Sequence, residues 1–243
     1  MLTKVQLAIA MAVVLLGASS FKPEGADTFP TSAGKLTVTL LGHASLLFQV
    51  DGKNIYVDPC KAFMKQENLP KADIVIVTHN HFDHLDAKEI EQLSSSTTVV
   101  VAPEQCSAIK PTVILKNGQK KTISGIVVEA VPAYNIQHKN EKGELFHPKG
   151  DGNGYVITIG GKRFYVAGDT EDIPEMASLK KIDVAFLPVN LPYTMDATMF
   201  EHAVKMVKPT IVYPYHYKGT DLTEVKKRLK GIKGVEVRIR NIY

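Results

Sequence analysis

Apolar and polar residues alternate along much of the chain, and this alternation predicts β-structure. Residues 36–40 and 45–50 both follow the two-residue period of a half-buried strand. Asp51-Gly52 is a turn signal typical of a hairpin, and it leads into a further strand-like stretch at residues 54–57. We therefore expect residues 35–57 to form a strand meander.

A continuous apolar run at residues 74–77 predicts a strand that is buried on both faces. The run ends in the sequence THNHFDHLD, residues 78–86, whose spacing fits neither a strand nor a helix. Asp86 is placed to cap a helix that begins at Ala87. The polar segment therefore connects a buried strand to a helix.

Strands and helices alternate in the rest of the chain. Strand-like stretches occur within residues 112–133 and at residues 97–102, 155–159, 163–167, 182–189, 210–213 and 235–240. Helical spacing occurs at residues 103–110, 196–207 and 221–229. A loop rich in Gly, His and Lys covers residues 134–153. No break in composition follows residue 34, so we expect one mixed α/β domain over residues 35–243, after a polar lead-in at residues 21–34.

The first twenty residues have the layout of a secretory signal peptide. Lys4 supplies a positive start, residues 5–18 form an apolar run interrupted only by Gln6, and Ala18-Ser19-Ser20 offers small residues for cleavage. The run is shorter than the roughly 20 residues that a membrane-spanning helix needs. We expect cleavage after residue 20 and a periplasmic or secreted mature protein, with an uncleaved N-terminal anchor as the alternative.

Composition excludes several classes of protein. Hydrophobic residues make up 44% of the 243 residues and charged residues 22%, values typical of a soluble globular protein rather than a disordered or fibrous chain. The formal charge of +4 is mild and evenly spread, so we expect no nucleic acid partner. We also expect no membrane contact beyond the signal peptide. Cys60 and Cys106 form no Cys-x-x-Cys pair, and we expect two buried side chains that one disulfide could join.

Candidate metal ligands are concentrated in residues 78–86. Four side chains that can bind a metal ion lie within six positions there: His79, His81, Asp83 and His84. Loops at the ends of buried strands commonly build the sites of α/β proteins. Imidazole nitrogen and carboxylate oxygen suit zinc, manganese or iron. Asp169 and His216 also follow predicted strands, and we expect both to lie beside this cluster.

These motifs resemble those of the metallo-β-lactamase superfamily. The segment THNHFDHLD, the GDT at residues 168–170 and the late His216 all match its pattern. The sequence LLGHASLLFQVDGKNIYVDP, residues 40–59, is similar to the branch of metal-dependent hydrolases that includes ascorbate-6-phosphate lactonase-like enzymes. The likeness covers about residues 35–218. It implies a four-layer αβ/βα sandwich with a dinuclear metal site in the cleft between two sheets.

The resemblance implies two divalent metal ions, expected to be zinc, with manganese or iron as alternatives. His79 and His81 would bind the first ion. The family usually completes this site with a histidine directly after a strand, where this chain has Tyr134-Asn135. The third ligand therefore stays open between His147, which we favour, and His138, Asn135 or water.

The resemblance assigns Asp83, His84 and His216 to the second ion, and Asp169 as a bridge between both ions. Asp58 would orient a ligand histidine, as carboxylates around metal sites commonly do. Asp83 is also the expected proton shuttle, because it can hold both a metal ion and the proton of the attacking water.

Two further histidines have other expected roles. His43, in the GHAS motif between two predicted strands, either faces the cleft as a substrate or proton-transfer group or makes a structural hydrogen bond. His202, on the predicted helix at residues 196–207, is expected at the surface.

The implied function is hydrolysis of a small-molecule substrate, in which a hydroxide that bridges two metal ions attacks an ester, lactone, amide or phosphodiester bond. Residues 190–195 and the loop at residues 134–153, with Lys149, are expected to contribute specificity. The alternatives are a nuclease or phosphodiesterase, a di-iron protein that uses oxygen or nitric oxide, and a non-catalytic metal- or ligand-binding envelope protein. The sequence does not define the oligomeric state.

Overall fold

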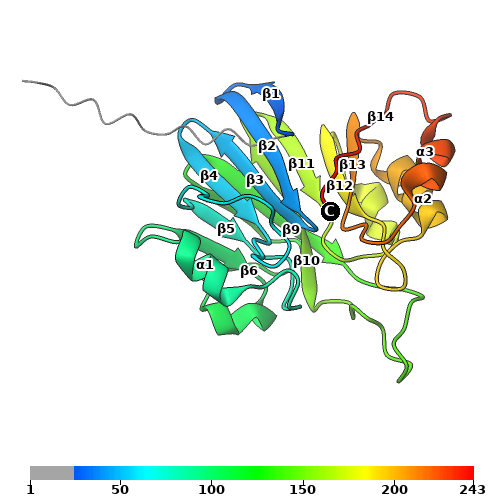
Figure 1. The fold of residues 1–243 in the computed structure, drawn as a ribbon, viewed down its shortest axis with the longest axis horizontal. Coiled ribbons are helices and arrows are strands. Elements are labelled where there is room, and N and C mark those ends of the chain that lie inside the picture. The colour runs from blue at the N-terminus through cyan, green and yellow to red at the C-terminus, as the bar shows by residue number, and fades with distance from the viewer. Residues whose placement is uncertain (1–24) are drawn as a thin grey trace, which may run out of the picture.

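Two seven-stranded sheets form the body of the computed structural model, which describes residues 25–243 (Figure 1). The predicted signal peptide at residues 1–20 lies outside the described residues. The first sheet runs in chain order through β1 (Asp27–Thr31), β2 (Gly34–Gly42), β3 (Ser45–Val50), β4 (Lys53–Val57), β5 (Ile74–Ile76), β6 (Val99–Ala102) and β7 (Val113–Ile114). Strands β1 to β4 are antiparallel, and β4 to β7 are parallel.

The second sheet runs from one edge to the other in the order β14, β13, β12, β11, β10, β9 and β8. Its strands are β8 (Lys120–Ile123), β9 (Ile126–Ala133), β10 (Gly152–Ile159), β11 (Lys162–Val166), β12 (Val184–Pro188), β13 (Ile211–Tyr215) and β14 (Glu236–Val237). Strands β8 to β11 are antiparallel, and β11 to β14 are parallel. Both sheets thus combine an antiparallel meander with parallel strands.

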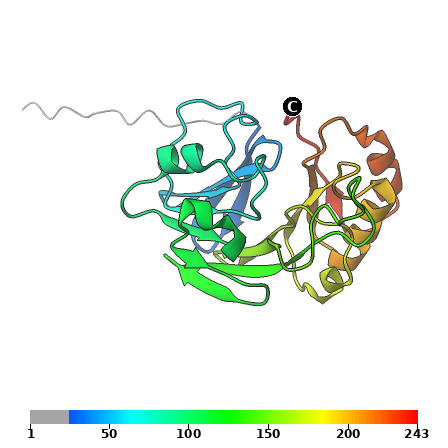
Figure 2. The same cartoon turned by 90° about the horizontal axis from the view of Figure 1, so that it is seen from below.

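Helices lie on the two outer sides of the paired sheets (Figures 1 and 2). The helix α1 (Ala87–Leu93) and the 3₁₀ helix η1 (Glu104–Ile109) pack on the first sheet. The helices α2 (Ala197–Val207) and α3 (Leu222–Leu229), with the 3₁₀ helix η2 (Pro174–Ser178), pack on the second sheet. The expected four-layer αβ/βα sandwich, in one domain, is confirmed. Within the described residues no helix is long and apolar enough to cross a membrane.

The two-residue period of the strands sorts side chains into separate cores. In β5, Ile74 and Ile76 face the core between the sheets, whereas Val75 faces the core beneath α1 and η1. In β12, Val184 and Phe186 likewise face inward, while Ala185 packs under the second pair of helices. A strand that is buried on both faces must be apolar throughout, which is why these runs are continuous in the sequence.

Several elements differ in extent from the expectations. Residues 27–31, expected in a polar lead-in, form β1, which pairs with β2 along its whole length. The helix expected at residues 103–110 is the 3₁₀ helix η1 at residues 104–109, with an interior kink at Cys106. The last predicted strand, at residues 235–240, is reduced to β14 at residues 236–237. Cys60 and Cys106 are both buried and both free, so the disulfide that was left open does not form.

Candidate metal centre

Most candidate ligands come from loops that follow parallel strands of the two sheets, whereas His147 comes from the loop between the antiparallel strands β9 and β10. His79 follows β5 in the first sheet, whereas Asp169 follows β11 and His216 follows β13 in the second. The irregular segment after β5 is fixed at both ends. Thr78 donates through its backbone N–H to Asp58 Oδ1 (2.7 Å), and Asp86 caps α1 by accepting from the Glu89 N–H (3.0 Å), as expected.

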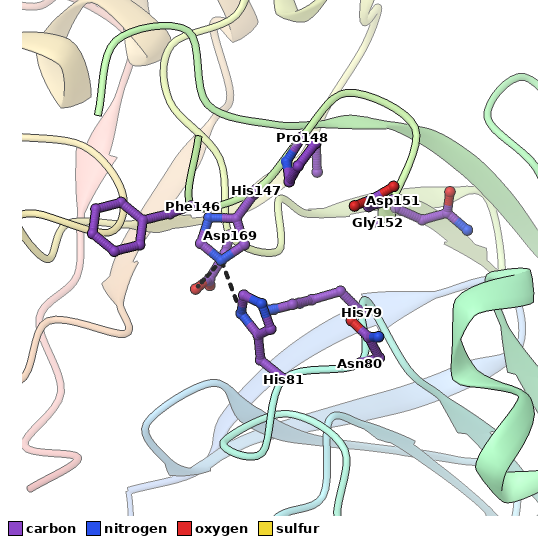
Figure 3. Close-up of a pocket in the computed structure, with 11 residues that line it drawn as sticks. His79, Asn80, His81, Phe146, His147, Pro148, Asp151, Gly152 and Asp169 are labelled. Carbon is purple, nitrogen blue, oxygen red and sulfur yellow. Dashed lines mark hydrogen bonds and ion pairs between the residues drawn. The ribbon is translucent and has the colours of Figure 1, made fainter. Parts of the chain in front are cut away.

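One group of side chains consists of His79, His81 and His147, whose candidate ligand atoms lie within 4.8 Å of one another. The Nε2 atom of His147 is 3.2 Å from Nδ1 of His81 and 3.4 Å from Oδ2 of Asp169. Figure 3 shows His147 directed at these two side chains beside a small cavity of about 30 Å³. Nitrogen atoms that converge in this way can share one cation.

A second group consists of Asp83, His84 and His216, together with His43. The Oδ2 atom of Asp83 is 3.5 Å from His216 Nε2 and 3.9 Å from His84 Nε2. Asp169 lies between the two groups. Its Oδ1 is 3.2 Å from His84 Nε2, and its Oδ2 is 3.4 Å from Nε2 of both His147 and His216. The structure therefore brings together every ligand candidate that we favoured.

The Nδ1 atoms of His84 and His79 are held by partners behind the site. His84 donates to the fully buried Asp58 (2.8 Å), the contact that the resemblance implied for this carboxylate. His79 donates to the Thr78 hydroxyl (3.0 Å), which in turn donates to Asp58 (2.6 Å). Such partners fix the ring orientation and leave Nε2 free for a metal ion.

The structure separates the three protein candidates for the remaining ligand of the first group. His147 joins His79 and His81, and Asn135 lies behind it, accepting from the His147 backbone N–H (2.9 Å) and from its Nδ1–H (2.6 Å). His138 turns away and donates through Nδ1 to Glu171 (2.7 Å). Asn135 therefore supports the ligand candidate.

Sequence reasoning missed Glu171, which organises this loop. Its carboxylate is fully buried and accepts from the backbone N–H groups of Ile136, Gln137 and His138, and from the Asn135 amide (3.0 Å). Its position two residues after Asp169, in the acidic sequence GDTED, was the available signal.

Sequence reasoning also missed Tyr243. Its hydroxyl donates to Nδ1 of His43 (2.7 Å), while Nε2 of His43 donates to Asp83 Oδ2 (3.0 Å). The His43 ring also stacks on Phe63 at a centroid distance of 4.5 Å. His43 is thus held on both nitrogens at the edge of the second group. His202 is exposed on α2 and pairs with Asp172 (2.6 Å), as expected for a surface residue.

Backbone conformation at the site is unusual. His43, Asp58 and His216 all have positive φ, of 51°, 45° and 47°. Such angles are uncommon for residues other than glycine, and they concentrate at functional sites. Gly168, directly before Asp169, has φ +66°, and a Cβ there would lie 3.0 Å from the Asn153 carbonyl oxygen. Only glycine fits this turn without displacement of its neighbours.

Electrostatics favours an ionised Asp169 and neutral His79 and His81. Burial alone would raise the pKa of Asp169, but the charges of His216 and His84 outweigh it and hold that pKa well below its usual range. Burial lowers the pKa of His79 well below its ordinary value, and it also lowers the pKa of His81. Metal ligands must be deprotonated, so this state suits a cation.

The pKa of His84 is shifted in the opposite direction from those of His79 and His81. Burial alone would lower its pKa, but the carboxylates of Asp169 and Asp58 outweigh burial and raise it well above the ordinary value. A positive charge is therefore favoured at this point of the centre, which either a proton on His84 or a metal ion beside it would supply.

Unpartnered polar atoms test whether the residues fit metal ions. Buried side-chain atoms without a hydrogen-bond partner in the described part of the chain include His79 Nε2, His84 Nε2, His216 Nε2 and Asp169 Oδ1. Buried polar atoms in proteins are nearly always satisfied, and these four face one another in the two groups. Their chemistry, imidazole nitrogen with carboxylate oxygen, matches zinc and related ions. The residues present therefore fit metal ions.

The sequence matches known proteins over most of its length. Residues 37–216 match the family model described as Beta-lactamase superfamily domain, and the chain belongs to that superfamily. It is 34% identical over 196 residues to a UPF0173 metal-dependent hydrolase of Thermococcus kodakarensis, a match that covers 74% of this chain and 84% of that one. Within the superfamily, the chain therefore belongs to the UPF0173 metal-dependent hydrolases.

Solved structures give the same result. A Parabacteroides distasonis protein, provisionally described as a metal-dependent hydrolase, is 45% identical, with a TM-score of 0.84 over 90% of this chain and 99% of that one. A metallo hydrolase of Ignicoccus hospitalis is 25% identical, with a TM-score of 0.70 over 84% and 94% of the two chains. The narrower resemblance to ascorbate-6-phosphate lactonase-like proteins stays a prediction.

Proposed function

We propose that this chain hydrolyses an ester, lactone, amide or phosphodiester bond of a small molecule at a centre of two divalent metal ions, with zinc as the expected metal. The observation that carries the proposal is the position of Asp169, whose carboxylate lies beside His147 of the first group and beside His84 and His216 of the second. A buried carboxylate between two sets of unpartnered imidazole nitrogens suits a bridge between two cations.

We assign one group of candidate ligands to each ion. The first ion would be held by His79, His81 and His147, and the second by Asp83, His84 and His216, with Asp169 shared between both. When bound, such ions activate water for attack at neutral pH and polarise the substrate oxygen. Asp58, Thr78 and Asn135 would keep the imidazole rings in place from behind.

We propose that Asp83 transfers a proton from the attacking water to the leaving group. Its side chain is 18% exposed, compared with 4% for Asp169 and 0% for Asp58, so it is the carboxylate of the centre that a substrate can reach. His43 donates to its Oδ2 and keeps that oxygen oriented, while the other oxygen stays available to accept a proton from water and pass it to the leaving group.

In the proposed reaction on an ester, water adds to the carbonyl carbon and the bond to the leaving oxygen breaks. That oxygen takes up one proton through Asp83, and the second proton of the water is released with the carboxylate product. The reaction needs no oxidant or reductant, in contrast to the di-iron alternative.

The test combines metal removal with a substitution at the shared ligand. Activity on a panel of p-nitrophenyl esters, lactones and bis(p-nitrophenyl) phosphate should require added metal and disappear with a chelator. Asp169→Asn should reduce turnover by at least about a thousandfold, because both ions lose a charged ligand. His202→Ala, which changes an exposed histidine outside the centre, is the control and should keep full activity.

Near-native activity of Asp169→Asn would overturn the dinuclear proposal. A metal-loaded protein that hydrolyses nothing on the panel would favour the metal- or ligand-binding alternative. Cleavage of the phosphodiester alone would favour the phosphodiesterase alternative.

We also propose that the protein is exported, on the basis of the signal-peptide pattern at residues 1–20. The chemical sequence of the mature N-terminus, read after expression in a Gram-negative host, tests this. A chain that begins at residue 21 in the periplasmic fraction supports export, and a chain that retains Lys4 in the cytoplasm contradicts it.

A further inference from the structure

A cavity of about 390 Å³ opens onto the candidate metal centre, a volume within the range of small-molecule sites. Candidate ligands from both groups line its inner end, among them His81 and His216. Its outer walls carry four aromatic side chains, which we call the aromatic rim: Phe63, Phe82, Phe146 and Tyr193. A molecule that lies against the aromatic rim therefore reaches the candidate ions.

The aromatic rim leaves apolar surface open to solvent. Phe82 is 81% exposed and Tyr193 is 46% exposed. Among the described residues, three more large hydrophobic side chains are exposed, and two of them belong to the segments that carry the rim: Ile136 and Leu191. Exposed apolar surface beside a cavity is typical of a binding groove, among other contact surfaces, and here Phe82 and Tyr193 line the cavity itself.

The aromatic rim is held in position by contacts of its own. Phe146 and Tyr193 make an edge-to-face pair at a centroid distance of 5.0 Å. The backbone carbonyl of Tyr193 accepts from the Asn135 amide (2.9 Å), and its N–H donates to the Asn190 carbonyl (3.0 Å). The bond to Asn135 ties together the two loops that were expected to set specificity, so the part of the rim formed by Phe146 and Tyr193 is held in place without a ligand.

Few polar groups line the cavity beyond the centre itself. Within the described residues, and apart from His43 and the candidate ligands, the lining residues with polar side chains are Asn190, Tyr193 and Lys218. Lys218 lies over the Phe63 ring at 5.8 Å from its centroid. Lys149, expected to contribute here, does not line the cavity and instead pairs with Glu175 (2.7 Å).

This lining does not match a sugar phosphate or a nucleotide. Each hydroxyl or phosphate oxygen that leaves water needs a hydrogen-bond partner, and an unpaired one weakens binding. Three polar groups cannot satisfy a polyhydroxylated ligand, whereas four aromatic rings match an acyl chain or an aryl ring. One lysine matches one negative charge.

We propose that the cavity takes carboxylic esters or lactones with an apolar acyl or aryl group and at most one negative charge, the apolar group lying on the aromatic rim and the charge beside Lys218. The inference rests on the proposed function, since it assumes that the bond at the centre is hydrolysed. It adds the substrate class that the superfamily alone does not define.

Binding of reaction products tests the aromatic rim without turnover. Isothermal titration calorimetry on the zinc-loaded full chain should show 4-phenylbutyrate binding at least about tenfold more tightly than acetate, and more tightly than glucose 6-phosphate. Phe82→Ala should reduce the preference for phenylbutyrate over acetate by about tenfold, the effect expected when the partner of an aryl ring is removed. Ile114→Ala, an exposed hydrophobic outside the cavity, should change nothing.

Turnover provides the second arm. For p-nitrophenyl acetate, butyrate and hexanoate, kcat/KM should rise about two- to fourfold for each methylene that the rim covers. Phe82→Ala should flatten this series while its zinc content stays unchanged. Lys218→Ala should lower kcat/KM for a glutarate monoester several-fold more than for the neutral butyrate ester, and an equal effect on both esters would remove Lys218 as the partner of the charge.

The two failures are distinguishable. Tight phenylbutyrate binding without hydrolysis of any ester would remove the proposed function and leave the aromatic rim as an apolar ligand site. Acetate and hexanoate esters could instead be hydrolysed at equal rates, with no effect of Phe82→Ala on product binding or on turnover. This result would overturn the proposed substrate class but not the proposed hydrolase function. Preference for glucose 6-phosphate in binding would also overturn the substrate class.

Discussion

Replacement of Asn135 by alanine should weaken the binding of one metal ion and leave the binding of the other unchanged. The Asn135 carbonyl oxygen accepts two bonds from His147, and its amide donates to Glu171 and to the Tyr193 carbonyl. The side chain is fully buried. Without it, the His147 ring loses the contact that fixes its orientation, whereas the second group, held by Asp58, is untouched.

The magnitude follows from two separate effects. Loss of the hydrogen-bond partner that orients a metal-binding histidine typically lowers metal affinity by about 10–100-fold. Four hydrogen bonds at about 1 kcal/mol each, partly replaced by water, put the loss of unfolding free energy at about 2–4 kcal/mol. For a domain of this size that corresponds to a fall in Tm of roughly 5–15 °C.

The assay is competition for zinc against a chromophoric chelator, in which the wild type should show two binding steps. Asn135→Ala should shift one step by the stated factor and leave the other within about twofold. The loss of stability is measured by thermal unfolding of the metal-free protein, so that the two effects stay separate. Gln137→Ala is the matched control, because this exposed neighbour contributes only its backbone N–H to Glu171.

Two results would refute the reasoning. Unchanged affinity in both steps would mean that Asn135 does not orient a ligand. An equal shift of both steps would mean that the two histidine groups do not act as separate sites.

Three further predictions concern other parts of the account. Tyr243→Phe should lower kcat about tenfold without loss of zinc, since His43 loses one hydrogen bond; unchanged kcat would assign His43 a structural role. Gly168→Ala should lower the unfolding free energy by about 1–3 kcal/mol more than Gly161→Ala, because both glycines have positive φ but only the Gly168 Cβ meets neighbours; equal losses in thermal unfolding would contradict the packing argument. Burial raises the pKa of Cys60 to about 11 and that of Cys106 to about 12, so neither thiol should react with Ellman's reagent at pH 8 until the chain is denatured; rapid reaction of the native protein would show that they are accessible.

The sequence predicted the fold and the site best where burial and ligand-type residues depend on neighbouring positions in the chain. The segment around His79 concentrates ligand-type residues after a run that must be buried on both faces, so strand, loop and site could be predicted together. The strand β1 was missed because its sequence, DTFPT, carries proline and polar residues, and its place depends on distant partners: the pairing with β2 and the burial of Phe29 against Phe164.

Long-range contacts were beyond a reading of the sequence alone. Nothing local in Asn135 shows that it supports His147, twelve residues away, and Tyr243 reaches His43 across 200 positions. The sequence favoured His147 over His138, but the contact with Glu171 that turns His138 away could not be predicted from it. Such partners are set by how the loops close over the sheet edge, which leaves no periodic signal.

The central claim is that two metal ions share Asp169, and metal content per chain tests it most directly. The mature protein, purified without chelators and then incubated with zinc or manganese, should hold about two equivalents by plasma mass spectrometry. Asp169→Asn should hold at most one under the same conditions, and His202→Ala should hold two. A wild-type chain that retains no more than one ion, or an Asp169→Asn chain that retains both, would contradict the account.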